Sequence, residues 1–527
     1  MTDSTAIAGT ASPPAESRLW SAAQALVAVL MCCVVVYSCA RYGPAIDNDT
    51  ADFFSAADSV VAGQGLIMTT GRLFILWPPL HPLLLAALGF AGIDHSSASL
   101  LINLAALCVT LWVGARLITR LSGSPALGLL FGLVVALAPD MYWIHTRALS
   151  EALFVAFCTL ALAGCCAYLE TPRPRYFALM VIGAGLAWVE RYAGMVLLPV
   201  LGACLLFAPG PERLLVRVRR SVVFGVLAGL PMLPWVIRNL IHTRQFTGDR
   251  GSFGEFGMPV PEALSQSTRT VVAWFVPQAG ALQAGLVLAA IAVTVAGCLL
   301  AVLGRERGRT EADAVLASKS GWVRLLPLIG FPVVYFVFTD VININYEIDG
   351  LGPRQMLPAL PAVWTLALLA GHRAFLAWRS RARLWSLPAG LVLLGMLGSY
   401  FSVTGPAALD RARQLHRDGA GFYSTERWRE SPILAHVPEM TVEAELYSND
   451  VYALYLFGGL RSSPLPPRPW RYRLLAQRLQ EEGQSIQAFW IFTNERNRLP
   501  AERMQEYVEI TPLIELADGA VYRIDPR

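Results

Sequence analysis

The chain has 527 residues, of which 55% are hydrophobic and only 15% are charged, and its mean hydropathy is +0.49. Soluble proteins carry more charge and less apolar sequence, so this composition indicates a polytopic membrane protein. The net charge of +4 is small and scattered along the chain, which excludes nucleic-acid binding as its main function.

The apolar stretches run without alternation, which predicts membrane helices and not a barrel. Residues 1–19 are expected to be a disordered cytoplasmic N-terminus, and the first span to be a signal anchor, with cleavage near Ala40 as the alternative. A transmembrane domain of about 11 helices is expected over residues 20–404. The expected spans are 20–41, 98–119, 124–142, 151–169, 176–190, 193–208, 221–238, 282–303, 322–340, 356–374 and 385–404.

A further apolar segment, residues 78–93, is too short to cross about 30 Å of hydrocarbon and opens with three prolines within five positions. When it is not counted as a span, most basic residues fall on one side of the membrane. These are Arg116, Arg120, Arg173, Arg175, Arg213, Arg217, Arg219, Arg220, Arg305, Arg307, Arg309, Lys319, Arg373, Arg379, Arg381 and Arg383. The positive-inside rule makes that side the cytoplasm. We therefore expect residues 78–93 to form a juxtamembrane or re-entrant helix.

With this topology, the first loop (residues 42–97) and the polar tail (residues 405–527) lie on the extracytoplasmic side of the membrane. The tail contains strand-like runs at 443–450, 487–494 and 520–525 and a helix-like run at 474–483. The expected architecture is thus an all-α polytopic membrane domain with a small C-terminal α/β extracytoplasmic domain. Such a protein would be a multi-pass protein of the inner (plasma) membrane.

The first loop carries acidic residues where it leaves the first span, at Asp47, Asp49, Asp52 and Asp58. Asp49 is expected to cap a helix over about 50–62 that lies on the membrane surface. A partly desolvated carboxylate at this boundary can act as a general base. The alternative is that these acids only solvate the loop and cap the helix.

Charged residues also stand at the outer ends of later spans. His145, Arg147 and Glu151 lie at the outer end of one span, within reach of the first loop, and a Glu at the edge of a membrane helix is costly unless it faces a wet cavity or a cation. Arg191, Arg238 and Arg354 follow at other span ends, where a guanidinium can bind a phosphate at two points. The alternatives are a helix start at Glu151, a structural ion pair at Glu190 and Arg191, and arginines that anchor spans at the interface.

The sequence contains no specific metal or nucleotide site. The nine cysteines lie in apolar segments without CxxC or HExxH spacing, and the single lysine, Lys319, has no Walker A loop around it. The histidines His81, His145 and His242 could bind a cation together with the acids, but their spacing does not require one. We predict no metal ligands from spacing, and a divalent cation stays open as a cofactor.

Several segments, in this order, resemble the GT-C superfamily of membrane glycosyltransferases. Within this superfamily they are similar to the branch of protein O-mannosyltransferases, aminoarabinose lipid A transferases and bacterial RgtA/B/C/D-like enzymes. The similar segments are DTADFFSAADSVVAGQGL, which begins at Asp49, LWPPLHPLLLAALG, SEALF at 150–154, ERYAG at 190–194, PWVIRN at 234–239 and RQMLPALP at 354–361. The resemblance covers most of residues 20–405. The chain differs from relatives at Thr50, where an acid is common, and at Trp77.

The resemblance implies a glycosyltransferase with a catalytic carboxylate in the first loop and a sugar donor carried on a polyprenyl phosphate. The acceptor would be an unknown lipid, glycan or protein of the cell envelope. Asp49 would be the general base of an inverting transfer and Glu151 the second acid. Substrate-binding positions would be Arg191, Arg238, Arg354, His145 and Asp52. The alternatives are a transporter or flippase of a lipid-linked or anionic solute, and a non-catalytic scaffold that presents the C-terminal domain.

Overall fold

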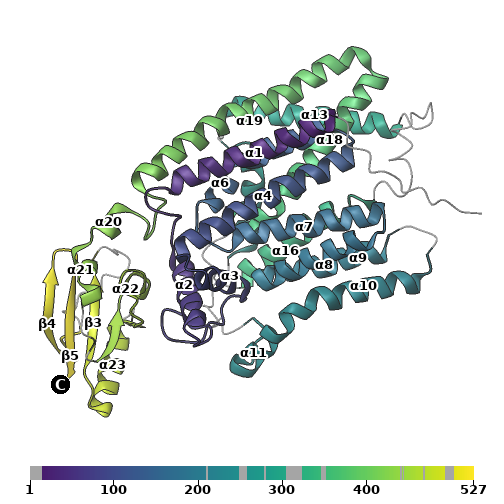
Figure 1. Ribbon diagram of the computed structural model, residues 1–527. Helices are drawn as coiled ribbons and strands as arrows, with labels where there is room; N and C mark the ends of the chain where they lie inside the picture. The colour runs from purple at the N-terminus through teal and green to yellow at the C-terminus, as the bar shows by residue number, and fades with distance from the viewer. Residues whose placement is uncertain are drawn as a thin grey trace, which may run out of the picture.

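The computed structural model describes residues 15–208, 212–247, 258–277, 280–303, 323–345, 352–439, 442, 444–466, 469–492 and 504–527. They form a bundle of long helices with a smaller α/β unit beside one of its ends (Figure 1). Residues 1–14 of the expected disordered N-terminus lie outside the described residues, and the first helix begins at Ala15.

The bundle is built from helices of very different lengths. They are α1 (Ala15–Cys39), α4 (His95–Ser122), α5 (Pro125–Ala136), α6 (Pro139–His145), α7 (Glu151–Glu170), α8 (Pro174–Glu190), α9 (Leu197–Leu206), α10 (Leu214–Gly229), α11 (Leu233–Thr243), α12 (Val260–Ala273), α13 (Ala281–Leu303), α16 (Leu326–Asn345), α17 (Pro353–Met356), α18 (Leu360–Arg381) and α19 (Arg383–Asp418). The expected domain boundary at 404–405 falls inside α19, which continues the last apolar helix to Asp418.

Within the described ranges, eight helices are long and apolar enough to cross a membrane, or nine if the bent pair α5 and α6 is one span. The expected number of 11 is therefore not confirmed. Two of the expected spans are short, because the chain breaks at Arg191: α8 has 17 residues and the stretch from Tyr192 to the end of α9 is a 3-10 turn followed by 10 helical residues. The extended backbone of Arg191 separates them.

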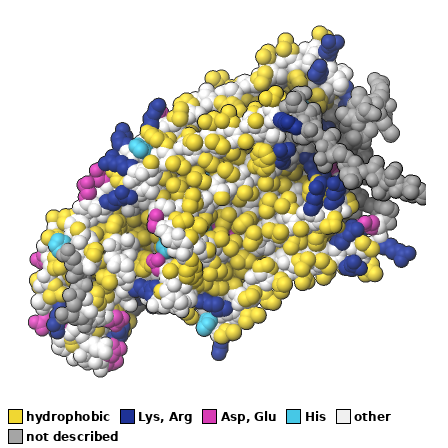
Figure 2. Space-filling view, viewed as in Figure 1, with side chains coloured by type: hydrophobic (Ala, Val, Ile, Leu, Met, Phe, Trp, Pro, Cys, Tyr) yellow, Lys and Arg dark blue, Asp and Glu magenta, His cyan; other side chains and the backbone are white. Residues whose placement is uncertain are grey.

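The outside of the bundle is apolar. Figure 2 shows a broad hydrophobic face with basic side chains gathered beyond its end. The exposed apolar residues of the bundle include Leu26, Val29 and Leu30 of α1, Val222 and Val226 of α10, Leu288, Ile291 and Val295 of α13, and Leu391 and Leu394 of α19. A water-soluble monomer rarely exposes an apolar surface of this size, so the bundle has the surface of a membrane protein.

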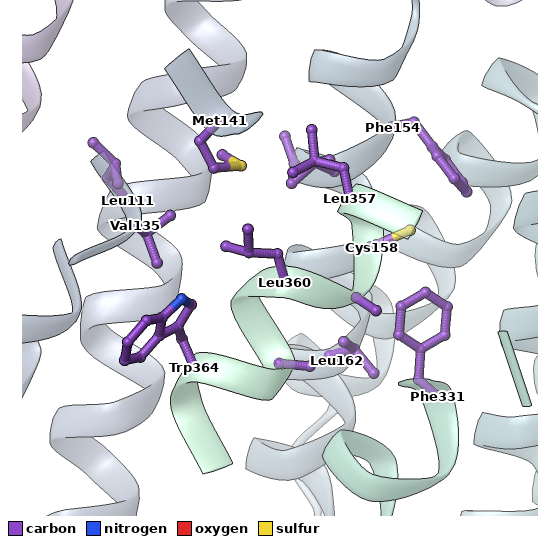
Figure 3. Close-up of a cluster of buried hydrophobic side chains, with 14 of the residues drawn as sticks. Leu111, Val135, Met141, Phe154, Cys158, Leu162, Phe331, Leu357, Leu360 and Trp364 are labelled. Carbon is purple, nitrogen blue, oxygen red and sulfur yellow. The ribbon is translucent and has the colours of Figure 1, made fainter. Parts of the chain in front are cut away.

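The core of the bundle joins helices from both halves of the chain. In Figure 3, Leu111, Val135 and Met141 from α4 to α6 lie around Leu360 and Trp364 of α18, while Phe154, Cys158 and Leu162 of α7 approach Phe331 of α16. Small residues bring α7 and α8 close together, because a Cβ on Gly183 would lie 2.6 Å from the backbone nitrogen of Ala161.

Two shorter helices, α2 (Asn48–Val61) and α3 (Leu80–Phe90), lie at the end of the bundle that faces the α/β unit (Figure 1). They pack against each other, and α3 also packs against α4 and α8. With 11 residues, α3 is about 16 Å long, roughly half of a hydrocarbon layer. Its length agrees with the expectation that residues 78–93 do not span the membrane.

The α/β unit is a five-stranded mixed sheet in the order β2-β1-β3-β5-β4. Its elements are α20 (Glu426–Arg429), α21 (Pro432–Ala435), β1 (Glu445–Ser448), α22 (Val451–Gly458), β2 (Ser463–Pro464), α23 (Pro469–Glu482), β3 (Ile486–Ile491), β4 (Val508–Leu516) and β5 (Gly519–Pro526). β1 is parallel to β2 and β3, whereas β5 is antiparallel to β3 and β4. The three strand-like runs in the sequence thus overlap β1, β3 and β5, whereas β2 and β4 lie outside them.

A narrow seam of extended backbone joins the two units. Ala45 pairs with Arg147, and its neighbour Ile46 pairs with Phe422, both in parallel. The amide of Ile46 also donates to Ser424 Oγ (3.2 Å). The first loop therefore lies between the α6–α7 turn and the start of the α/β unit, and its position depends on both.

Candidate active site

The first turn of α2 places the first-loop acids. Asp47, and not Asp49, caps this helix: Thr50 donates to Asp47 Oδ1 from its amide (3.1 Å) and its hydroxyl (3.0 Å). The expected cap at Asp49 is therefore wrong, because the helix begins two residues earlier. Burial, with the nearby charge of Asp49, raises the pKa of Asp47 to about 6, although Arg354 opposes the shift. Asp49 lies in the first turn with its carboxylate free for another partner.

That partner is Arg354 of α17. Its Nη2 lies 2.5 Å from Asp49 Oδ2, and its Nε donates to Glu151 Oε1 at the first residue of α7. Arg191, at the break after α8, also pairs with Glu151 Oε1, at 2.8 Å. The Glu151 side chain is 2% exposed and the Asp49 side chain 27%. The structure thus brings Asp49, Glu151, Arg191 and Arg354 together in one ion-pair network built from four elements.

A second buried pair fixes α3 beneath α2. His81 Nδ1 lies 3.1 Å from Glu190 Oε1, and both side chains are buried. The imidazole also packs against the ring of Phe53, with 5.0 Å between the centroids. Glu190 directly precedes Arg191, so the pair holds α3 against the same break that supplies Arg191 to the network.

Three other predicted site residues do not belong to the network and make contacts that hold the local structure. Asp52 accepts from the amide (3.0 Å) and the hydroxyl (2.8 Å) of Thr69, and burial raises its pKa to about 6 despite these bonds. Arg238 donates to Phe74 O (2.9 Å). His145 is buried in α6 and its Nδ1 donates to the backbone of the same helix. Asp52 and Arg238 thus hold the loop after α2 at two points.

The α/β unit contributes residues that sequence reasoning missed. The hydroxyl of Tyr423 lies 3.0 Å from Asn48 Oδ1 and 2.9 Å from Asp450 Oδ1. At the other end of α2, Asp58 accepts from His95 (2.7 Å) and from the hydroxyl of Tyr455. Burial raises the pKa of Asp58, but these two hydrogen bonds together with the charges of His95 and Arg461 outweigh it, and the pKa lies below its usual value. No sequence signal marks either tyrosine, because each lies more than 370 residues from its partner on α2.

The described part of the chain contains no group of three or more His, Cys, Asp or Glu side chains arranged to hold a metal ion. The histidines named as candidates stand on different helices, His81 on α3, His145 on α6 and His242 on α11. The positive charge between Asp49 and Glu151 belongs to Arg354. The ion-pair network can therefore hold the Asp49 carboxylate in place at the end of the bundle, with the guanidinium of Arg354 beside it.

No protein-family model and no curated protein matches this chain. Solved structures, in contrast, are similar to this chain. ArnT from Cupriavidus metallidurans bound to undecaprenyl phosphate is similar to it with a TM-score of 0.60 and 13% identity, over 96% of this chain and 98% of that chain. The apo state of the same ArnT gives a TM-score of 0.61 at 14% identity, over 97% and 98% of the two chains.

The arabinofuranosyltransferase AftD from Mycobacteria is also similar, with a TM-score of 0.55 and 15% identity. The match covers 97% of this chain but 40% of AftD. ArnT and AftD are both GT-C glycosyltransferases. This chain therefore has the GT-C fold, which confirms the resemblance seen in the sequence.

Proposed function

We propose that this protein is a glycosyltransferase that moves a sugar from a polyprenyl-phosphate donor to an acceptor of the cell envelope. The observation that carries the proposal is the contact of Arg354 with both Asp49 and Glu151. It joins the two acids that the GT-C resemblance singles out, within a GT-C fold. The ArnT structure was solved with undecaprenyl phosphate, which supports a lipid-linked donor for this chain as well.

The position of the network suits a substrate that arrives through the bilayer. α7 has 20 residues and is about 30 Å long, the thickness of the hydrocarbon layer. Glu151 begins this helix, and Glu170 ends it beside Arg120 and Arg324. The network would therefore lie at one headgroup level and the basic end at the other. Since the positive-inside rule assigns the basic end to the cytoplasm, the transfer would take place at the outer face.

The proposed sugar transfer needs an accessible carboxylate that acts as the base and a second carboxylate that holds the arginine beside it. Asp49 Oδ1 has no hydrogen-bond partner among the described residues, so it can accept a proton from an acceptor hydroxyl. The resulting oxygen would attack the anomeric carbon while the bond from that carbon to the phosphate oxygen breaks. The polyprenyl phosphate would leave with the electron pair, and the configuration would invert. Glu151 would act through Arg354 by holding it against Asp49.

The assignment of Asp49 can be tested in cells that lack the gene. The glycans of lipid A, surface polysaccharide and envelope proteins are compared after complementation with the wild type, Asp49→Asn or Asp58→Asn. Asp58 is a matched control because it stands on the same helix but pairs with His95 and Tyr455. We expect a product that is lost only with Asp49→Asn, at equal protein level. Activity retained by Asp49→Asn would contradict a role as the base.

The outer location of the site has an independent test. Alkaline phosphatase, which folds only outside the cytoplasm, is fused after Arg527 in one variant and after His372, near the basic end of α18, in another. We expect activity from the first fusion only. Activity from the second fusion alone would place the α/β unit and the site in the cytoplasm and reverse the proposed topology.

A further inference from the structure

The arginines expected to bind phosphate already have partners. Arg191 and Arg354 pair with carboxylates, and Arg238 donates to a backbone carbonyl and stacks on Trp235 at 4.5 Å. Arg147 is different. Its side chain makes no hydrogen bond and no ion pair with any residue that the structure describes, although the residue is only 8% exposed.

Arg147 is held by two aromatic rings instead. The centre of its guanidinium lies 4.0 Å from the ring centroid of Trp143 on α6 and 5.2 Å from that of Phe422. Such contacts hold the cation through its faces and leave the N–H groups at its edge without partners. A guanidinium presented in this way can bind a phosphate through two parallel hydrogen bonds.

Phe422 takes up an unfavourable backbone conformation to make this contact. Its φ is +50°, in the left-handed region that bulky residues avoid, and its side chain is 56% exposed. The seam holds it there through the pairing with Ile46. Strained residues persist where the surrounding structure determines them, and they are frequent at binding sites.

Arg147 also lies close to the candidate active site. Its backbone pairs with Ala45, two residues before Asp47, and its charge interacts with those of Asp47, Glu151 and Arg354. Burial lowers the pKa of Arg147 to about 10, because its charge is partly removed from water without a carboxylate bound to it. Asp47 does not serve as that partner, since no ion pair within 4.0 Å joins the two side chains, and its Oδ1 accepts from Thr50. A buried cation without a partner is costly, so the site favours an incoming anion.

We propose that Arg147 binds the phosphate group of the lipid-linked donor, between Trp143 and Phe422. This inference rests on the proposed function and names the residue that receives the donor. The tryptophan and the exposed phenylalanine suit the headgroup level of a bilayer, where aromatic side chains gather. Asp49 and Glu151 would meanwhile keep Arg191 and Arg354 in place, and the phosphate would not have to displace either pair.

The test measures binding of undecaprenyl phosphate to the full chain in detergent, by the rise in melting temperature as the lipid is titrated. Undecaprenol, which lacks the phosphate, and inorganic phosphate, which lacks the lipid, are titrated in parallel. The variants are Arg147→Gln and Arg147→Lys. Arg116→Gln is the matched control. Arg116 also stacks on a tryptophan, Trp112, at 4.6 Å, but it lies near the C-terminal end of α4 and not at the candidate active site.

We expect undecaprenyl phosphate to bind the wild type and Arg116→Gln equally, and to bind Arg147→Gln about 10- to 100-fold more weakly. Arg147→Lys should bind about tenfold more weakly, because it keeps the charge and loses the two-point contact. If Arg147→Gln does not fold, the binding of undecaprenyl phosphate to Arg147→Lys tests the proposal instead. Undecaprenol should not stabilise any variant.

The outcomes separate this inference from the function on which it rests. If undecaprenyl phosphate does not bind the wild type, the lipid-phosphate donor of the proposed function is overturned. If the wild type binds it and the Arg147 variants bind it equally well, only the role of Arg147 is overturned. If inorganic phosphate stabilises the wild type as strongly as the lipid at equal concentration, Arg147 belongs to a free-anion site and the lipid donor at this position is overturned.

Discussion

Helix α7 carries a carboxylate at each end, and each carboxylate pairs with two arginines. Glu151 pairs with Arg354 and Arg191, and Glu170 pairs with Arg120 and Arg324. The two ends differ in burial, since the Glu151 side chain is 2% exposed and the Glu170 side chain 25%. The same pairing of a carboxylate with two arginines therefore occurs at a buried and at a more exposed end of one helix. Comparing the coupling energies at the two ends measures how burial changes the strength of the pairing.

Replacing Arg354 by Gln leaves the buried Glu151 carboxylate with Arg191 alone, which should lower the free energy of unfolding by about 3–5 kcal/mol. The double variant Glu151→Gln with Arg354→Gln should recover most of that loss, because the nearly fully buried carboxylate is then neutral, while Asp49 and Arg191, which lose a partner, are 27% and 24% exposed. The expected coupling energy is about 3 kcal/mol. For Arg120→Gln and Glu170→Gln it should stay below about 1 kcal/mol, because water screens this pair.

The measurement is reversible unfolding in mixed micelles, followed by circular dichroism, for the two single variants and the double variant at each end of α7. The difference between the two coupling energies is the quantity of interest, since effects common to both ends cancel. A coupling energy for Glu151 and Arg354 that is no larger than that for Glu170 and Arg120 would refute the view that this network is a buried, tightly held part of the site.

Three further predictions concern the surroundings of the site and the bundle. Asp52 has a pKa of about 6 in the folded protein against 3.8 in the unfolded chain, so its stabilising contribution is complete below about pH 4 and is lost as the pH rises through 6. The gain in melting temperature on Asp52→Asn should therefore grow from about pH 4 to about pH 7, and a pH-independent difference would contradict it. His81→Gln should destabilise the protein by about 3–5 kcal/mol in the same unfolding assay, and adding Glu190→Gln should restore most of it; no recovery would mean that the pair is not coupled. Gly183→Ala should cost about 1–3 kcal/mol because its Cβ would meet the α7 backbone, whereas Gly225→Ala, which meets nothing within 4 Å, should cost little.

The long apolar helices could be predicted from the sequence, because hydropathy reports burial in lipid directly. The breaks between them could not. Residues 124–142 read as one span, yet the chain bends by 66° between α5 and α6. Pro139 starts the second helix and cannot donate a backbone hydrogen bond to the first. Proline is apolar enough to leave the hydropathy of this stretch unchanged, so composition alone does not locate the bend.

For the site, the sequence indicated the residues but not their pairing. Charges among apolar neighbours are costly, which is why Asp49, Glu151, Arg191 and Arg354 could be singled out one by one. Their contacts depend on how distant segments pack: Arg354 is 305 residues from Asp49 and 203 from Glu151. The role proposed for Arg147 could not be predicted from the sequence either, since it depends on the ring of Phe422 in a different unit of the protein.

The seam between Ile46 and Ser424 has a consequence for how the protein is made. The two residues are 378 positions apart, so at roughly 5–20 residues per second the ribosome needs about 20–75 s to synthesise the second after the first. Throughout that interval the segment around Ile46 lacks the strand partner that orders it. Nascent chains released before about residue 424 would thus leave an unsatisfied backbone edge at the membrane surface, open to chaperones and proteases.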